Sequence, residues 1–464
     1  MNTITQDLAR FAAETEYGDL PEQIVEETKK VLMEHVGVGL AALSTDKGKL
    51  AAAIARRLGG FPESSIIGLG DRVSATSAAL ANGELMIALD YHDNMSFGHD
   101  GLFIIPSALA MAESVGASGK ELIASMAVGL EISSRLARAA RWHTLTSEEV
   151  KAAIANPPKD KNAHSAYGAA AAAARLLNLN SKKMAHALGI AGRHVDMSLT
   201  AGNPGMRGFT KYVVPGWQNT GSVMSALLAD MDYIGDTSAL DDTGRLGWDP
   251  RYIAEDLGKT WVFNLQLHYK PYPCCGAFHH NLDCFYNVIE QNNLMPQEIE
   301  KVKIYGRWMQ AAPGAKKEIG GIYEAQFNQP YNISLLAHRI RRGVEWVDLD
   351  TMKNPDILNF MDKVTFFADP EFAKKAEEER IRDPRLRPAR VDITARGKTF
   401  VSEIKERRGD TFTSVAWTWE DAKGKFQHNG ERILTNGKIE RATKAILELE
   451  KIDKISQLVK EIIL

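Results

Sequence analysis

Cysteine is scarce in this sequence, and the scarcity excludes several kinds of site. Only three of the 464 residues are cysteines. Three thiols cannot build a disulfide framework, and they cannot supply the four ligands of an iron–sulfur cluster or of a Cys₄ zinc site. We therefore expect a protein without a cysteine-held cofactor.

An excess of charge of one sign is also lacking. The 59 acidic and 56 basic residues leave a formal net charge of −3, so net charge alone does not draw the protein to nucleic acid or to an anionic membrane. No apolar run approaches the roughly 18 residues of a membrane span, and the N-terminus lacks the basic and apolar regions of a secretory signal. We expect a cytoplasmic protein that binds neither nucleic acid nor membrane.

Apolar residues in the first half of the chain recur at helical spacing. Residues 21–36 carry them at steps of three and four after Pro21. Ser118 and Glu121 form a capping-box signature before a further apolar repeat. The alanine-rich run 169–174 suits close packing between other helices. These patterns predict one all-helical body.

The periodicity changes in the second half. Four short segments, 301–305, 364–367, 391–395 and 400–404, are typical of strands, with helical stretches between them. The tail returns to helical spacing, and a long amphipathic helix needs an apolar surface to cover. We therefore predict a mainly α fold: a large all-helical domain formed by residues 1–265 and 425–464, with a smaller α/β lid domain inserted over residues 266–424.

The densest polar cluster lies at residues 90–101, between two apolar segments. Its five ionisable side chains would lose hydration unless they meet partners. Three interpretations stay open: a solvated loop, a carboxylate–histidine acid/base site, and a metal site formed by the pairs His92-Asp93 and His99-Asp100. The metal site would be that of an HD-type metal phosphohydrolase, but Gly98 breaks the helix between the two pairs.

A second cluster lies at residues 268–280. Lys270 precedes Pro271 near the predicted domain boundary, and clefts between domains often hold ligands. The alternative is a lysine that only marks the hinge. Cys274 and Cys275 are adjacent, so they lack the two-residue gap that lets two thiolates bind one zinc ion.

Three further segments are weaker candidates. His164 precedes the alanine-rich run, and Tyr331 lies in a polar–aromatic turn. A glycine-rich stretch contains Arg207 and Lys211, but it lacks the residue order of a phosphate-binding loop. No GxSxG nucleophile elbow is present.

Taken in order, these segments resemble the MmgE/PrpD family, which includes 2-methylcitrate dehydratases, cis-aconitate decarboxylases and iminodisuccinate epimerases. The resemblance covers almost the whole chain. It is carried by residues 79–83 leading to 89–93 and His99, by 164–177, 187–192, Lys211 ahead of 226–229, 270–274 with His279, and 325–327 with Pro330-Tyr331.

The resemblance implies an active site between an all-helical domain and a lid, in a homodimer that needs no metal or organic cofactor. Its members act on small di- or tricarboxylates. The family's functional positions fall on Asp93, His99, His164, Lys211, Lys270 and Tyr331.

The sequence departs from the family pattern at three places. Asp100-Gly101 stands where many members have Pro-Ser, and an extra acid there favours a substrate with fewer negative charges or with an amine. In the register of some branches the second histidine would fall on Lys159, although we prefer His164. Cys275 stands where some decarboxylating members have a histidine, which counts against cis-aconitate decarboxylase.

We therefore expect a cofactor-independent hydro-lyase, similar to 2-methylcitrate dehydratase, that abstracts a proton next to a carboxylate. Alternatives are an iminodisuccinate-like epimerase or isomerase, a cis-aconitate-type decarboxylase, the metal phosphohydrolase, and a catalytically silent helical dimer. The expected roles are general acid/base for His164 or His99, orientation by Asp93, proton donation by Tyr331, and carboxylate binding by Lys211, Lys270 and Arg207.

Overall fold

The computed structural model describes residues 3–95, 98–140, 163–195, 214–246, 248–305, 319–383 and 386–464. These residues are mainly helical, which confirms the predicted fold class. None of the helices in these ranges is long and apolar enough to cross a membrane.

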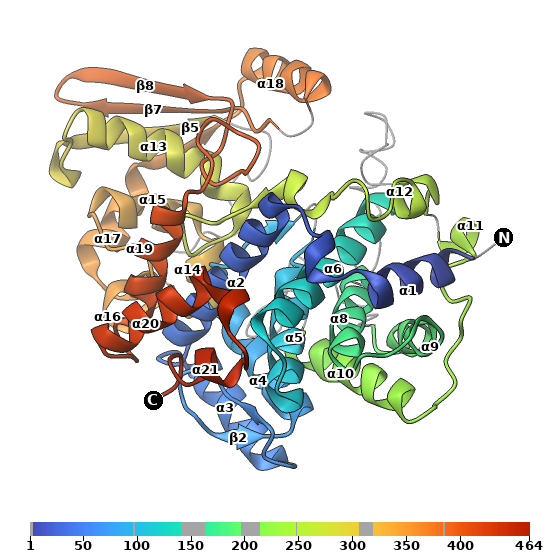
Figure 1. Cartoon of the computed structure of the whole chain (residues 1–464). Coiled ribbons are helices and arrows are strands. Elements are labelled where there is room, and N and C mark those ends of the chain that lie inside the picture. The colour runs from blue at the N-terminus through green and yellow to red at the C-terminus, as the bar shows by residue number, and fades with distance from the viewer. Residues whose placement is uncertain are drawn as a thin grey trace.

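The first half of the chain folds into a layered helical body (Figure 1). Its centre is formed by α2 (Glu22–Ala42), α4 (Ala75–Ile87), α5 (Gly101–Val115), α6 (Gly119–Ala139), α8 (Ala163–Leu176) and α10 (Pro215–Asp230). Shorter or peripheral elements surround them: α1 (Ile4–Glu14), α3 (Asp46–Leu58), β1 (Ser64–Ser65), β2 (Arg72–Val73), α9 (Ser181–Ala191), α11 (Thr243–Leu246) and α12 (Arg251–Ala254).

Helix α8 is the alanine-rich run, and it packs against α5, α6 and α10. Its alanines at 169–174 are all fully buried. At Gly168 the backbone approaches so closely that an added β-carbon would collide with the carbonyl oxygen of Gly129 in α6. Small side chains therefore set the short distance between these two helices.

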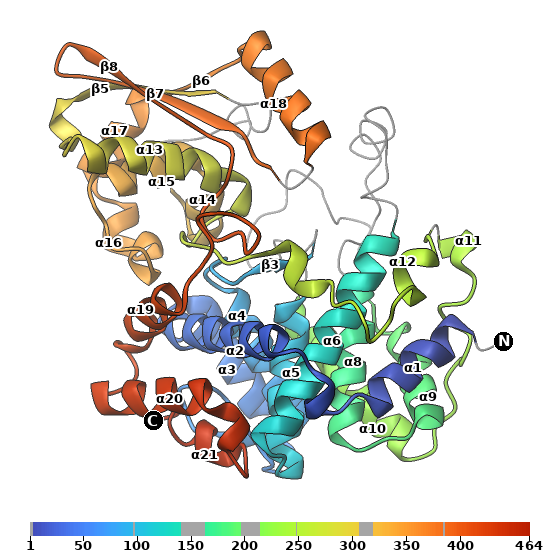
Figure 2. The ribbon, with the colours of Figure 1, turned by 45° about the horizontal axis from the view of Figure 1, so that its top comes forward.

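The C-terminal segment returns to this body, as Figures 1 and 2 show. It consists of α19 (Trp419–Gly430), α20 (Asn436–Leu447) and α21 (Ser456–Val459). Helix α19 packs along α2, which lies almost 400 residues earlier in the chain. Because the predicted start at residue 425 falls inside α19, we place the boundary ahead of this helix.

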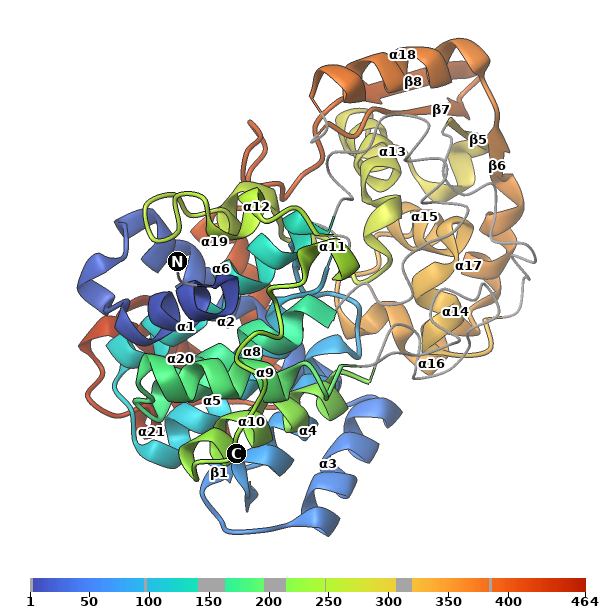
Figure 3. The ribbon, with the colours of Figure 1, turned by 90° about the vertical axis from the view of Figure 1, so that its right-hand side faces the viewer.

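The other lobe is built on a four-stranded sheet (Figure 3). The predicted strands are confirmed, in the order β6 (Val364–Phe367), β5 (Ile299–Tyr305), β7 (Ala389–Ala395), β8 (Lys398–Ile404). Strands β5 and β6 are parallel, and the other pairs are antiparallel. The helices of this lobe are α13 (His279–Gln291), which packs on β7 and β8, α14 (Ile322–Phe327), α15 (Gln329–Ala337), α16 (Leu349–Met352), α17 (Pro355–Phe360) and α18 (Pro370–Arg382).

The two chain crossings between the lobes lie side by side. Strand β4 (Leu267–His268) pairs with β3 (Asn94–Met95) of the helical body. Tyr269 lies on the crossing that enters the lid, and Gly409 lies on the crossing that leaves it. The amide of Tyr269 donates a hydrogen bond to the carbonyl oxygen of Gly409 at 2.9 Å. Gly409 has a φ of +96°, and a β-carbon there would collide with the Tyr269 carbonyl, so the position requires glycine.

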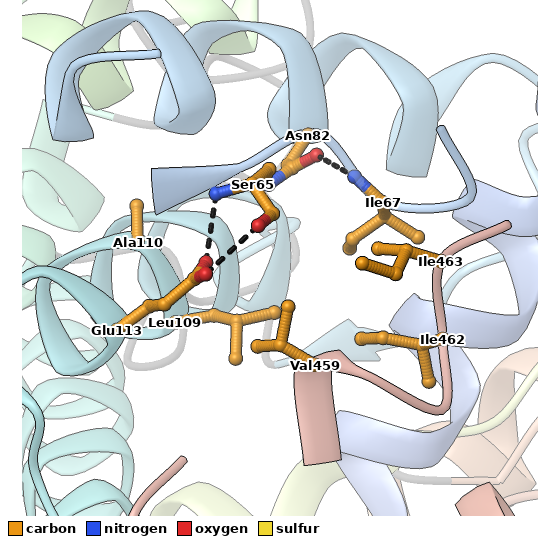
Figure 4. Close-up of a pocket in the computed structure, with 9 residues that line it drawn as sticks. All are labelled: Ser65, Ile67, Asn82, Leu109, Ala110, Glu113, Val459, Ile462 and Ile463. Atoms are coloured by element: carbon orange, nitrogen blue, oxygen red, sulfur yellow. Dashed lines mark hydrogen bonds between the residues drawn. The ribbon is translucent and has the colours of Figure 1, made fainter. Parts of the chain in front are cut away.

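Residues 79–83, which carry part of the family resemblance, lie in α4 and make structural contacts through Asn82. The side chain of Asn82 accepts from the amide of Ile67 at 3.0 Å (Figure 4). It also donates to the carbonyl oxygen of Ser65 at 3.1 Å. Glu113 accepts from the amide and the hydroxyl of Ser65. The pocket drawn there is closed by apolar C-terminal side chains such as Val459. These contacts join β1 to α4 and α5 of the helical body.

Replacing Gly168 by alanine tests the close helix packing. We expect Gly168→Ala to lower the free energy of unfolding by about 2 kcal/mol, because overpacking forces the backbones of α6 and α8 apart. Gly424→Ala is the matched control: Gly424 lies exposed on α19 with open space around it, so the change should stabilise by about 0.5–1 kcal/mol. Urea unfolding measures both, and an equal effect of the two changes would contradict this packing.

Candidate functional site

The site begins at a strained turn after α4. Asp90 has a φ of +49°, a left-handed conformation that costs a non-glycine residue about 1 kcal/mol or more. The ammonium group of Lys270 donates to the carbonyl oxygen of Asp90 at 3.0 Å and to its carboxylate at 2.6 Å. Both side chains are fully buried. The predicted lid lysine is therefore anchored to the first residue of the polar cluster.

Asp93 faces α2. Its carboxylate lies 3.2 Å from Nδ1 of His35, and both side chains are fully buried. Burial, together with the nearby charge of Asp100, raises the pKa of Asp93 to about 7. Burial lowers the pKa of His35 to about 4, so this histidine is neutral near pH 7. Gly101 lies against the pair, and a β-carbon there would collide with the His35 ring.

Asp100 holds His164. Its carboxylate is 2.9 Å from Nε2 of His164 and accepts from the hydroxyl of Ser165 at 2.7 Å. Burial opposes its ionisation, but the contacts with His164, Ser165 and Ser133 lower the pKa of Asp100 below its usual range. The acid in contact with His164 is therefore Asp100 rather than Asp93, and the role of Asp93 in orienting a catalytic histidine stays a prediction.

His99 is held by a second histidine. Its Nδ1 lies 2.8 Å from Nε2 of His92, and the two rings meet edge to face with centroids 4.8 Å apart. His92 is fully buried, whereas His99 is partly exposed. One of the two nitrogens must donate a proton to the other, so the tautomers of the two rings are coupled.

The two His-Asp pairs do not form a metal site in the described residues. No group of three or more His, Cys, Asp or Glu side chains there is arranged to hold a metal ion. Asp93 contacts His35, and Asp100 contacts His164, so the carboxylates turn to different sides. The HD-type phosphohydrolase interpretation gains no support from this arrangement.

Lys425 also lies at the candidate site, although no sequence motif points to it. Its ammonium group donates to the carbonyl oxygens of Tyr91 at 2.7 Å and Lys270 at 3.0 Å, and it pairs with the carboxylate of Glu34. Burial lowers the pKa of Lys425 and raises that of Glu34. The helical spacing gives one indication: Lys425 falls on the same face of the helix as Ala422. This face is buried, so a lysine there is not simply exposed to solvent.

A further network lies at the crossings between the lobes. His268 lies 3.0 Å from Asp410, which also accepts from Arg407 at 2.7 Å. The other ring nitrogen of His268 is 3.3 Å from His279, a residue of the family segment. Burial lowers the pKa of His268 to about 3, so its ring is neutral at physiological pH. This network ties the two crossings together.

The lid contributes Tyr331 and Gln326. Tyr331 is fully buried, and its hydroxyl donates to the carbonyl oxygen of Trp346 at 2.9 Å. It would have to leave this acceptor to reach a substrate, so its role as a proton donor stays a prediction. Gln326 donates to the carbonyl oxygen of Ala88 at 2.9 Å and so joins the lid to the end of α4.

Three predicted positions lie outside the described residues. These are Arg207 and Lys211, both predicted to bind carboxylates, and Lys159, the alternative position of the second histidine. Their roles stay predictions.

Two domains of one known protein family together match almost the whole chain. The MmgE/PrpD N-terminal domain matches residues 6–254, and the MmgE/PrpD C-terminal domain matches residues 272–451. The chain is 22% identical to cis-aconitate decarboxylase of Homo sapiens over 99% of this chain and 94% of the human protein. It is 23% identical to cis-aconitate decarboxylase of Mus musculus over 99% and 93%. It is 25% identical to the cis-aconitate decarboxylase-like protein oryM of Aspergillus oryzae over 60% of each chain.

The raised pKa of Asp93 predicts a pH-dependent stability difference. Between the ordinary pKa of 3.8 and about 7 the folded protein binds a proton that the unfolded chain has lost, so stability falls as pH rises. An asparagine at this position does not titrate. Asp93→Asn should therefore gain stability relative to the natural protein across this window, by up to about 4 kcal/mol for roughly three pKa units.

Urea unfolding at pH 5, 6, 7 and 8 measures this difference. Asp350→Asn is the control because Asp350 is exposed, and its stability should follow that of the natural protein at every pH. If the stability of Asp93→Asn varies with pH in the same way as that of the natural protein, the carboxyl of Asp93 does not hold its proton in the folded state.

Proposed function

Because the chain belongs to the MmgE/PrpD family, we propose that it is a cofactor-independent hydro-lyase, similar to 2-methylcitrate dehydratase, that acts on a small di- or tricarboxylate. At the level of the family, the likeness supports a lyase-type function in carboxylate metabolism. The substrate and the choice of dehydration are our proposal.

One observation carries the proposal. Residues 90–101 hold three groups suited to this chemistry: Asp90 anchors Lys270, Asp100 holds His164, and His92 holds His99. A single short segment thus gathers a cation that suits carboxylates and two histidines that suit proton transfer. The segment starts at a strained turn, and such strain is typical of functional sites.

The mechanism follows from these contacts. His164 takes the proton from the carbon next to a substrate carboxylate, and the ionised Asp100 stabilises the imidazolium that forms. The electron pair left on that carbon becomes the new double bond as the hydroxyl on the neighbouring carbon leaves. His99 supplies the proton that the hydroxyl needs to leave as water. Lys270 stabilises the negative charge that develops at the carboxylate.

A decarboxylase is the second candidate, and the names of the relatives favour it. Loss of CO₂ next to a carboxylate leaves the same kind of carbanion, which His164 in its protonated form would quench. Cys275 in place of a histidine still counts against this reaction. An epimerase would use the two histidines to remove and return one proton, and we keep it as a third outcome of the test.

The reaction is tested by NMR in D₂O with 2-methylcitrate, citrate, cis-aconitate and iminodisuccinate. We expect loss of water from a hydroxy-tricarboxylate. Loss of CO₂ from cis-aconitate with deuterium on the product would identify the decarboxylase, and exchange with inversion would identify the epimerase. If no carboxylate reacts, the lyase proposal is wrong and a binding role is favoured.

The roles of Asp100 and Lys270 are tested by substitution. Asp100→Asn should lower kcat by about 10²–10⁴-fold, because His164 loses the carboxylate that stabilises its charged form. Lys270→Met should raise KM and also lower kcat, because the substrate carboxylate loses the cation that binds it and that stabilises the charge developing in the reaction. His338→Gln serves as the control: His338 ends α15 in the lid and contacts the Ser334 carbonyl at 2.8 Å. Steady-state kinetics on the reacting substrate separate the three variants, and unchanged turnover in Asp100→Asn would reject His164 as the acid/base group.

The predicted homodimer also stays a proposal, which the family resemblance supports. Sedimentation equilibrium of the purified protein tests it, and a mass of one chain at micromolar concentration would contradict it.

A further inference from the structure

Lys425 is a lysine in a place that lysines rarely occupy. It lies in α19 with only 7% of its surface exposed, on the face that α19 turns to α2. Lysine is almost never this buried unless its charge is paired. Here the pairing partner is Glu34 of α2, which also accepts from the indole of Trp417 at 2.9 Å.

The ammonium group makes a complete set of contacts. It carries three N–H donors, and it meets three acceptors: the carboxylate of Glu34, the carbonyl oxygen of Tyr91 and the carbonyl oxygen of Lys270. It also lies 3.8 Å from the centre of the Tyr91 ring. Three segments far apart in the sequence therefore meet at one nitrogen.

Two of these segments carry the site. Tyr91 directly precedes His92 and Asp93, and Lys270 is the lid lysine itself. Asp90 holds the side chain of Lys270 while Lys425 holds its backbone. The charged groups that face Lys425 are Glu34 from α2, Asp93 from the polar cluster and Lys270 from the lid crossing.

Stability alone does not explain a lysine at this position. A buried ion pair can often be replaced by apolar side chains without loss of stability. An apolar side chain, however, cannot donate hydrogen bonds to the carbonyls of Tyr91 and Lys270. The feature that only an ammonium group supplies is the link between these two backbones.

We propose that Lys425 is a positioning residue that couples the lid lysine Lys270 to the turn at residues 90–93. This proposal rests on the proposed lyase function, because Lys270 is expected to bind the substrate carboxylate. Lys425 does not touch the substrate itself. It acts by keeping Lys270 and the polar cluster in fixed positions relative to each other at the junction of the two lobes.

The test compares Lys425→Met with Lys423→Met. Lys423 lies two residues earlier on α19 and pairs with Glu420 at the surface, so Lys423→Met should keep the natural kinetics. Lys425→Met should lower kcat/KM about 10²-fold, through both a higher KM and a lower kcat, because misplacement of a reacting group by about 1 Å has effects of this size. A loss of folded protein alone would lower apparent kcat and leave KM unchanged, and that result would overturn the proposal.

A double variant separates positioning from neutralisation of Glu34. Glu34→Gln with Lys425→Met removes both buried charges, so its unfolding midpoint should return close to that of the natural protein. If Lys425 positions the site, kcat/KM of the double variant stays about 10²-fold low. If kcat/KM recovers together with stability, Lys425 only neutralises Glu34 and the proposal is wrong.

Hydrogen exchange measured by mass spectrometry tests the coupling without any substrate. In Lys425→Met and in the double variant, amides in residues 88–95 and 267–272 should exchange at least several-fold faster, while those of β5 and β7 keep their rates. Unchanged exchange in both segments would overturn the proposal, whichever carboxylate reacts. If no carboxylate reacts but these segments do exchange faster, the lyase function fails and the coupling stands.

Discussion

Charged side chains that leave water need partners, and this requirement organises the junction between the helical body and the lid. Several acids among the described residues are buried there, and most of them are paired: Asp90 with Lys270, Glu34 with Lys425, and Asp100 with His164. Asp93 lies beside the neutral His35, and its pKa is instead raised to about 7 by burial. Removing one member of such a pair leaves an uncompensated charge in a medium of low polarity. These buried pairs therefore restrict how the two lobes can be arranged at the junction. They also fix the positions of the candidate site residues.

The helical body adds a second constraint through its small residues. His164 and Ser165 lie in the first turn of α8, one turn before Gly168, where the backbone approaches Gly129 of α6. Larger side chains would push α8 away from its neighbours and carry His164 away from Asp100. The packing of the small alanine and glycine residues thus controls the distance between Asp100 and His164.

Much of the fold could be predicted from periodicity, and the site only in part. The sequence predicts the four strands of the lid and the return of the C-terminal helices, although the predicted domain boundary at residue 425 falls inside α19. Asp93, His99, His164 and Lys270 were selected, but their partners were not. Asp100 was interpreted as an acid facing the substrate, whereas it contacts His164. Lys425 was missed, because a single lysine in an amphipathic helix has no signature until its neighbours are known.

The sequence by itself determined the local elements, the two-part organisation and the residue types available for chemistry, because hydrophobic spacing and capping act over a few residues. Only the tertiary structure decided which acid meets which histidine and which cation. Asp100 and His164 are 64 residues apart, and Lys425 is 334 residues from Tyr91. Such pairings depend on how α2, α8 and α19 pack. This packing is the sum of many weak contacts between distant residues, which local sequence patterns do not predict.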